Sequence, residues 1–179
     1  GSAATLDSAR TGALVPVPPG MHGFGPADTQ YFYAAGEVQE PSGTLANGAT
    51  ATFTVEHPKQ VPNGHSLAEL AVEDPAMDYS YIEAGWIVQH NKAPRLFIFW
   101  WLQNTPECYD QGCGYVQSGN GIQPGAKLKT GSSITLTWQH IDGDWWLIVN
   151  GKKSGYYPDS QWSGAFDQTG FAQTFGEVA

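Results

Sequence analysis

Five Asn-Gly or Asp-Gly pairs are spread along the chain, and they constrain its fold more than any other feature. They lie at 47–48, 63–64, 120–121, 142–143 and 150–151. Such pairs favour the left-handed backbone of a two-residue hairpin turn, so each marks a point where an antiparallel strand can reverse. The last two pairs flank the run 144–149 and predict a three-stranded meander over 134–141, 144–149 and 152–157.

The rest of the chain also reads as strands and turns, because no window gives a convincing amphipathic helix. The segment 65–72 alternates as a strand does, with Leu67, Glu69 and Ala71 on one face. Many short strands separated by turns predict an all-β fold, an antiparallel β-sandwich over residues 31–179. Residues 1–30 are rich in Pro and Gly and are expected to form an extended leader or linker.

Composition excludes two classes of partner. The chain has 179 residues, enough for one domain, with eight Lys and Arg against 17 Asp and Glu. Because this small number of basic groups cannot neutralise a phosphate backbone, we expect no nucleic-acid partner. The strongest apolar run, 96–102, is far shorter than the ~20 residues of a membrane span, so no membrane partner is expected.

The sequence contains no motif typical of a metal site or of a nucleophilic serine. The five histidines are scattered, with no H-x-H or H-x-x-x-H pair, so we expect no metal site and no other cofactor: they are His22, His57, His65, His90 and His140. The chain also lacks the G-x-S-x-G motif that presents a nucleophilic serine.

The two cysteines, Cys108 and Cys113, are separated by four residues. This spacing is neither the redox C-x-x-C pair nor a complete zinc site. It fits a local disulfide that pins a turn, or a pair of reduced thiols in the core. A disulfide would indicate an oxidising compartment, so we expect a secreted protein.

Two glutamates are embedded in strand-like runs beside a glycine. In 79–88, alternate residues from Ile82 to Val88 form an apolar core face, which places Glu83 on the opposite face beside Tyr81 and Gly85. A glycine there could leave room for a ligand, although a solvated acid on an edge strand gives the same pattern. Glu177 follows Gly176 in the run 171–179.

Together these segments resemble a known family. The motifs Ile82-Glu83-Ala84-Gly85-Trp86 and Gly176-Glu177-Val178, with the cysteine pair between them, resemble the catalytic domain of the neprosin family of glutamic prolyl endopeptidases. The resemblance runs from about residue 48 to 179. It implies two curved sheets with a concave active-site cleft, a catalytic pair formed by Glu83 and Glu177, and a Cys108–Cys113 disulfide. Plant members carry a propeptide domain and extend beyond the second motif, so we expect a shorter microbial member or a trimmed chain.

Two carboxyls that share a cleft can divide the hydrolysis of a peptide bond. One is ionised and activates water, while the other keeps a proton for the carbonyl oxygen and the leaving nitrogen. Like charges raise one of the two pKa values, so activity is expected in acid. The resemblance implies cleavage beside proline, on its C-terminal side, in proline-rich peptides or proteins, and we expect a monomer.

An apolar, rigid proline ring suits an aromatic wall. Tyr81, Tyr115, Trp146 and Tyr156 are the candidates for this wall, although packing in the core or on a sheet face is the commoner explanation for each of them. Two other functions use the same features. A glycoside hydrolase also needs paired carboxylates, and a non-catalytic carbohydrate-binding sandwich uses Trp and Tyr faces as sugar platforms.

Overall fold

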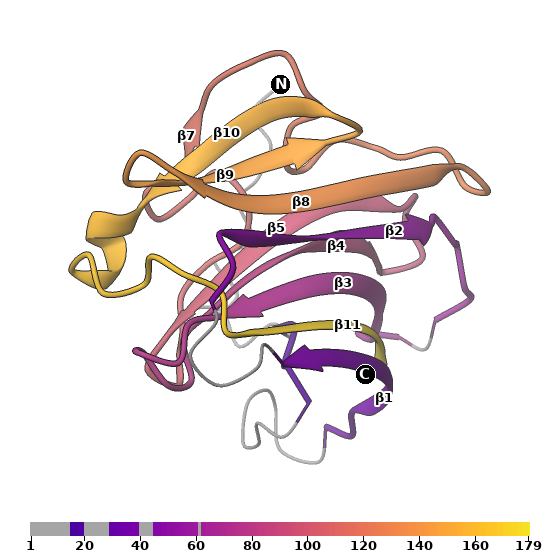
Figure 1. The fold of residues 1–179 in the computed structure, drawn as a ribbon. Helices are drawn as coiled ribbons and strands as arrows, with labels where there is room; N and C mark the ends of the chain where they lie inside the picture. The colour runs from indigo at the N-terminus through magenta and orange to yellow at the C-terminus, as the bar shows by residue number, and fades with distance from the viewer. Residues whose placement is uncertain (1–14, 20–28, 40–44, 61) are drawn as a thin grey trace.

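The computed structural model describes residues 15–19, 29–39, 45–60 and 62–179, and within them the chain forms two antiparallel sheets that pack face to face (Figure 1). The first sheet has six strands in the order β1-β11-β3-β4-β5-β6. Its strands are β1 (Phe32–Gln39), β3 (His65–Glu73), β4 (Tyr81–Gln89), β5 (Arg95–Leu102), β6 (Thr105–Pro106) and β11 (Phe171–Val178).

The second sheet has five strands in the order β2-β8-β9-β10-β7. Its strands are β2 (Gly48–Thr54), β7 (Val116–Gln117), β8 (Ser133–Ile141), β9 (Asp144–Val149) and β10 (Lys152–Pro158). One short 3-10 helix, η1 (Asp159–Trp162), follows β10. The prediction of an all-β antiparallel sandwich is confirmed. No helix in the described ranges is long and apolar enough to cross a membrane.

The predicted meander is confirmed as β8, β9 and β10, which are successive neighbours in the second sheet. Its turns have the expected backbone, with positive φ at Asp142 (50°) and Gly143 (86°), and at Asn150 (50°) and Gly151 (77°). The 65–72 segment is also a strand, as predicted, and forms most of β3.

The main core lies between the two sheets. Even-numbered residues of β4, from Ile82 to Val88, face this core and pack with Trp138, Trp145 and Leu147 of the second sheet. The other face of β4 is buried as well. Because β4 lies between β3 and β5 in a six-stranded sheet, Glu83 belongs to a central strand and is not a solvated acid at an edge.

A second apolar cluster covers the face of the first sheet that is turned away from the second sheet. Its sheet residues include Leu67, Phe97, Phe99 and Phe175, and it also contains Val15, Val17 and Tyr109 from outside the strands. Val15 and Val17 are 3% and 1% exposed, so residues 15–17 pack on the sheet. The rest of the predicted 1–30 leader, apart from 18, 19, 29 and 30, lies outside the described residues.

The disulfide between Cys108 and Cys113 is present. Its loop is anchored on β5, where Asp110 N–H donates to the Ile98 carbonyl at 2.9 Å and Asp110 Oδ1 accepts from Ile98 N–H at 3.2 Å. This anchoring brings the Tyr109 ring to 4.9 Å from the Phe99 ring, centroid to centroid. The loop thereby adds an aromatic side chain to the outer face of the first sheet.

Candidate active site

Both motif glutamates lie on the outer face of the first sheet, which we call the carboxylate face. Glu177 on β11 is opposite Leu67 of β3, and Glu83 on β4 is opposite Ala71 of the same strand. Directly paired residues point to the same side of a sheet, so the two glutamates share a face with β3 between them. Their exposed fractions are 0% for Glu83 and 1% for Glu177.

A third carboxyl lies between them. Glu69 is on β3, midway between Leu67 and Ala71, and is 0% exposed. It is therefore a diagonal cross-strand neighbour of both Glu177 and Glu83, and such neighbours have Cα atoms about 7–8 Å apart. The three glutamates form a row that crosses β11, β3 and β4.

Glu177 is held at both of its carboxyl oxygens. Oε1 forms a hydrogen bond with His65 Nε2, and Oε2 accepts the Val17 backbone N–H at 2.9 Å. Burial raises the pKa of Glu177, while His65, the Val17 N–H and the Tyr33 hydroxyl oppose that rise by stabilising the ionised form. These contacts fix the orientation of the carboxyl within a buried site.

Glu83 has different neighbours. Burial raises its pKa well above the usual range, the adjacent side chains of Glu69 and Trp101 oppose that rise, and the charge of Glu177 adds to it. Burial and the charges of Glu83 and Glu177 also raise the pKa of Glu69. Ionising all three buried groups together would be costly, so the row retains protons at pH values where an exposed glutamate is ionised.

Residues 15–19, with the sequence Val-Pro-Val-Pro-Pro, lie against the carboxylate face. The Val15 and Val17 side chains pack into its apolar cluster, and the Val17 backbone N–H reaches Glu177. A proline-containing stretch of the chain itself thus contacts a motif glutamate through its main chain.

The four predicted aromatic substrate residues are placed in three different parts of the fold. Tyr81 lies on the carboxylate face, in the cluster with Phe99 and Trp101. Tyr115 lies between the sheets, with its ring 5.4 Å from the Tyr157 ring. The structure therefore brings Tyr81 to Glu83 and leaves Tyr115 in the main core.

Trp146 and Tyr156 are cross-strand partners on the second sheet, with ring centroids 4.8 Å apart. Their neighbours Trp145 and Tyr157 belong to the main core, so Trp146 and Tyr156 face outward from the second sheet. Both sheets separate this pair from the glutamates.

Sequence reasoning missed four residues of the face: His65, Glu69, Tyr109 and Gln173. His65, Glu69 and Gln173 are buried polar side chains at 1%, 0% and 2% exposure. The signal for Glu69 was available, since the alternation of β3 places it on one face with Leu67 and Ala71, and His65 follows from the same period. The same period in β11 places Gln173 on one face with Phe175 and Glu177, whereas nothing local pointed to Tyr109.

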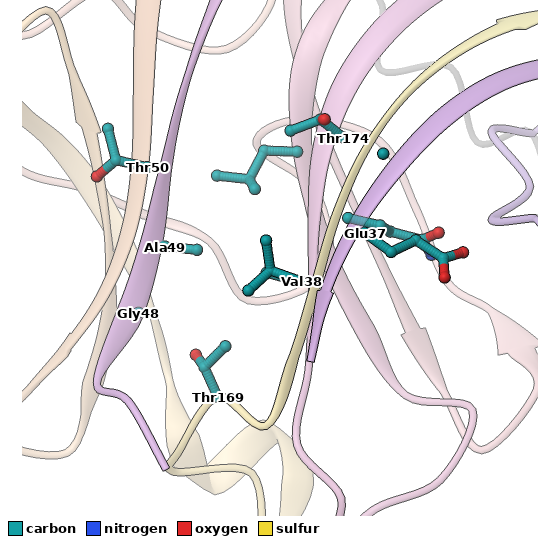
Figure 2. A pocket seen from close by; sticks show the side chains of 11 residues that line it. Glu37, Val38, Gly48, Ala49, Thr50, Thr169 and Thr174 are labelled. Atoms are coloured by element: carbon teal, nitrogen blue, oxygen red, sulfur yellow. The ribbon is translucent and has the colours of Figure 1, made fainter. Parts of the chain in front are cut away.

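The cavity between the two sheets is not a second acidic site. A cavity of about 370 Å³ lies between β2 and the β1–β11 edge, on the inter-sheet side, and is lined by Val38, Ala49 and Leu70 among others (Figure 2). Of the described residues lining it, Glu37 is the titratable one, and its side chain points away (Figure 2). Among the described residues, no group of three or more His, Cys, Asp or Glu is arranged to hold a metal ion.

Fold and site together define a β-sandwich with a buried multi-carboxyl site on the outer face of one sheet. The sequence profile described as Neprosin matches residues 62–179, which is more than half of the chain and includes both motif glutamates and the disulfide. The chain belongs to the Neprosin family.

Solved structures with the same fold include scytalido-glutamic peptidase. The crystal structure of that protein with a peptide-based transition-state analog matches this chain with a TM-score of 0.53 and 10% sequence identity. The match covers 81% of this chain and 63% of the peptidase chain. A second match is SCP-B, a member of the eqolisin family of peptidases, in a complex with the tripeptide Ala-Ile-His. Its TM-score is 0.50 and its sequence identity 10%, over 81% of this chain and 62% of the SCP-B chain. The chain thus spans less than two thirds of the length of these two peptidases.

Proposed function

We propose that this protein is an acid-active glutamic endopeptidase that cleaves peptide bonds beside proline, on the C-terminal side. The observation that carries the proposal is the convergence of Glu83 and Glu177 on one buried face of one sheet. Family membership and the shared fold with glutamic peptidases support the same chemistry.

The reaction needs one ionised and one protonated carboxyl. The ionised carboxylate takes a proton from a water molecule, whose oxygen attacks the peptide carbonyl carbon. The protonated carboxyl donates a hydrogen bond to the carbonyl oxygen and then transfers its proton to the leaving nitrogen as the C–N bond breaks. Burial raises the pKa values of both groups, and the charge of Glu177 further raises that of Glu83, which favours this mixed state in acid.

The Val15–Pro19 stretch supports a peptide substrate. Its Val17 N–H donates to Glu177, and its valines lie among aromatic side chains of the face, so an extended chain containing proline fits there. Of the four predicted aromatic residues, Tyr81 shares the carboxylate face, and we assign it the contact with a proline ring. We further propose that the protein is secreted and monomeric, with proline-rich peptides or proteins as substrates.

The test uses a proline-containing peptide across pH 2–8. Glu83→Gln and Glu177→Gln should each lower kcat by at least about 10²-fold, because each removes one acid–base group. Glu56→Gln, at an exposed position, is the matched control. If either active-site variant cleaves at the wild-type rate, the proposed pair is wrong.

A polysaccharide arm tests the alternatives. The outward-facing Trp146–Tyr156 pair is the feature that would suit a sugar platform. Retention on a polysaccharide without turnover, abolished by Trp146→Ala, would support a carbohydrate-binding module. Hydrolysis of a glycoside that is lost in Glu83→Gln would support a glycoside hydrolase.

A further inference from the structure

We propose that Glu69 is a third functional carboxyl of this site, a positioning residue that shares a proton with Glu83 through a direct carboxyl–carboxyl hydrogen bond. This proposal rests on the proposed function, because it assigns a role within the same reaction.

The position of Glu69 is the first argument. It lies on β3, the strand between the two motif glutamates, and its side chain shares their face. Both of its carboxyl oxygens are buried, and among the described residues no N–H or hydroxyl group donates to either of them. An ionised carboxylate in that setting would be strongly destabilised, so Glu69 is suited to hold a proton.

The partner for that proton is Glu83. Both Glu83 carboxyl oxygens are also buried and, like those of Glu69, accept from no N–H or hydroxyl group of the described residues. A proton held between the two neighbouring carboxyls therefore satisfies an oxygen of each, with Glu69 O–H as the donor and the Glu83 carboxylate as the acceptor. Glu69 lowers the pKa of Glu83, and Glu83 raises that of Glu69, in keeping with this direction. Trp101 lies on the same face of the neighbouring strand, β5.

Gly85 explains how Glu69 fits. It lies directly opposite Glu69 on β4. A Cβ at Gly85 would lie 2.7 Å from Glu69 Cβ and 2.1 Å from the Ala68 carbonyl oxygen. The glycine of the Glu83-Ala84-Gly85-Trp86 motif thus makes room for the β3 backbone at Glu69.

The charged and titratable surroundings of Glu69 are mostly acidic or phenolic. The groups that interact with it electrostatically or share its face on β3 are Glu83, Glu177, Tyr33, Tyr109, His65 and Glu73. His65 is the basic group among these, and its hydrogen bond is to Glu177. Next to Glu83, the negative charge of Glu69 is therefore neutralised by a proton. When Glu83 gives or takes a proton during the reaction, Glu69 keeps its carboxyl in place.

Two substitutions separate this role from simple packing. Glu69→Gln keeps a donor, since the amide N–H can bond to Glu83, but it cannot release a proton. Glu69→Leu keeps the volume and removes the donor. We expect Glu69→Gln to retain kcat within about 10-fold and Glu69→Leu to lose about 10²-fold, with KM changed less than kcat in both.

The pH dependence supplies the decisive readout. In Glu69→Gln the alkaline side of the kcat profile should lack the ionisation at which Glu69 loses its proton, so it should differ from wild type. Infrared spectra at neutral pH should show a protonated-carboxyl C=O band in wild type that is weaker in Glu69→Gln. Circular dichroism establishes that both variants fold.

Three results would overturn the proposal: a wild-type kcat in Glu69→Leu, an equal loss in both variants, or a kcat profile of Glu69→Gln that superimposes on wild type. The infrared comparison needs no turnover. If the wild-type protein cleaves no peptide, the proposed function fails, and the infrared band alone decides whether Glu69 holds the proton.

Discussion

His65 and Glu177 form a buried hydrogen-bonded pair on the carboxylate face, with His65 Nε2 at Glu177 Oε1. The other oxygen of Glu177 accepts the Val17 N–H at 2.9 Å. Glu83, by contrast, lies beside another carboxyl, that of Glu69, and beside the indole of Trp101. Two glutamates of identical chemistry are thus held by different partners, which is the condition for giving them different roles in one reaction.

Replacing His65 should shift the pH profile of the enzyme. His65 lowers the pKa of Glu177 through its hydrogen bond and its charge, so His65→Leu should raise that pKa. The limb of the kcat/KM profile that reports Glu177 should then move to higher pH. The measurement is a profile over pH 3–8, with His57→Leu as the control at an exposed position. An unmoved profile in a folded His65→Leu protein would contradict the assigned pairing.

Replacing Val17 by proline should free the carboxylate face. Proline has no N–H, so the hydrogen bond to Glu177 Oε2 is lost. A hydrogen bond to a charged group contributes about 1.5–3 kcal/mol. On the proposed function, a peptide substrate competes with the Val15–Pro19 stretch for Glu177. We expect about a tenfold lower apparent KM for a peptide substrate. Val17→Ile, which keeps the N–H, should behave as wild type; a KM that is equal in both variants would count against this contact.

Stability should increase on acidification. Burial raises the pKa of Asp110 to about 7 from its ordinary 3.8, against the opposing effects of the Ile98 N–H and Arg95. Between pH 3.8 and about pH 7, Asp110 holds a proton in the folded protein that it has released in the unfolded chain. The stabilisation is therefore complete below about pH 4 and is lost as the pH rises through about 7, amounting to about 4 kcal/mol.

Urea unfolding at several pH values measures this effect. The free energy of unfolding should be greater at pH 4.5 than at pH 7.5, and the buried glutamates contribute in the same direction because their pKa values are also raised. Asp110→Asn removes one titrating group and should reduce the difference between the two pH values. A wild-type protein that is less stable at pH 4.5 would refute the prediction.

Alanine at Gly85 should destabilise the fold. The new Cβ would clash with the Ala68 carbonyl oxygen at 2.1 Å, and backbone atoms cannot move aside as a flexible side chain can. We expect a loss of about 3 kcal/mol, the upper end for overpacking. Gly176→Ala is the matched control, because a Cβ there comes no closer than 3.7 Å to Leu67 O. Similar unfolding midpoints for the two variants would contradict the predicted clash.

Much of the fold could be predicted because the signals are local. Side chains alternate along any strand, so the alternation around Glu83 was enough to place it opposite the core face. The Asn-Gly and Asp-Gly pairs predicted the meander because those residues adopt the positive φ that its turns require. The Cys108–Cys113 bond follows in the same way from a short separation along the chain.

The positions of Tyr115, Trp146 and Tyr156 could not be predicted in this way. An aromatic residue in a strand is compatible with either face and with either sheet, and its sequence neighbours do not say which sheet lies against it. The structure leaves Tyr115 between the sheets and the Trp146–Tyr156 pair facing outward, while the disulfide loop brings Tyr109 to the carboxylate face.

The sequence alone determined that Glu83 and Glu177 lie in strands beside glycines, because strand period and turn chemistry act over a few residues. The tertiary structure decided that β3 separates their strands, which places Glu69 between them and His65 at Glu177. That register joins segments far apart in the chain, and it depends on how both faces of the sheet are buried. The row of carboxyls, and the protons it must hold, follow from that burial.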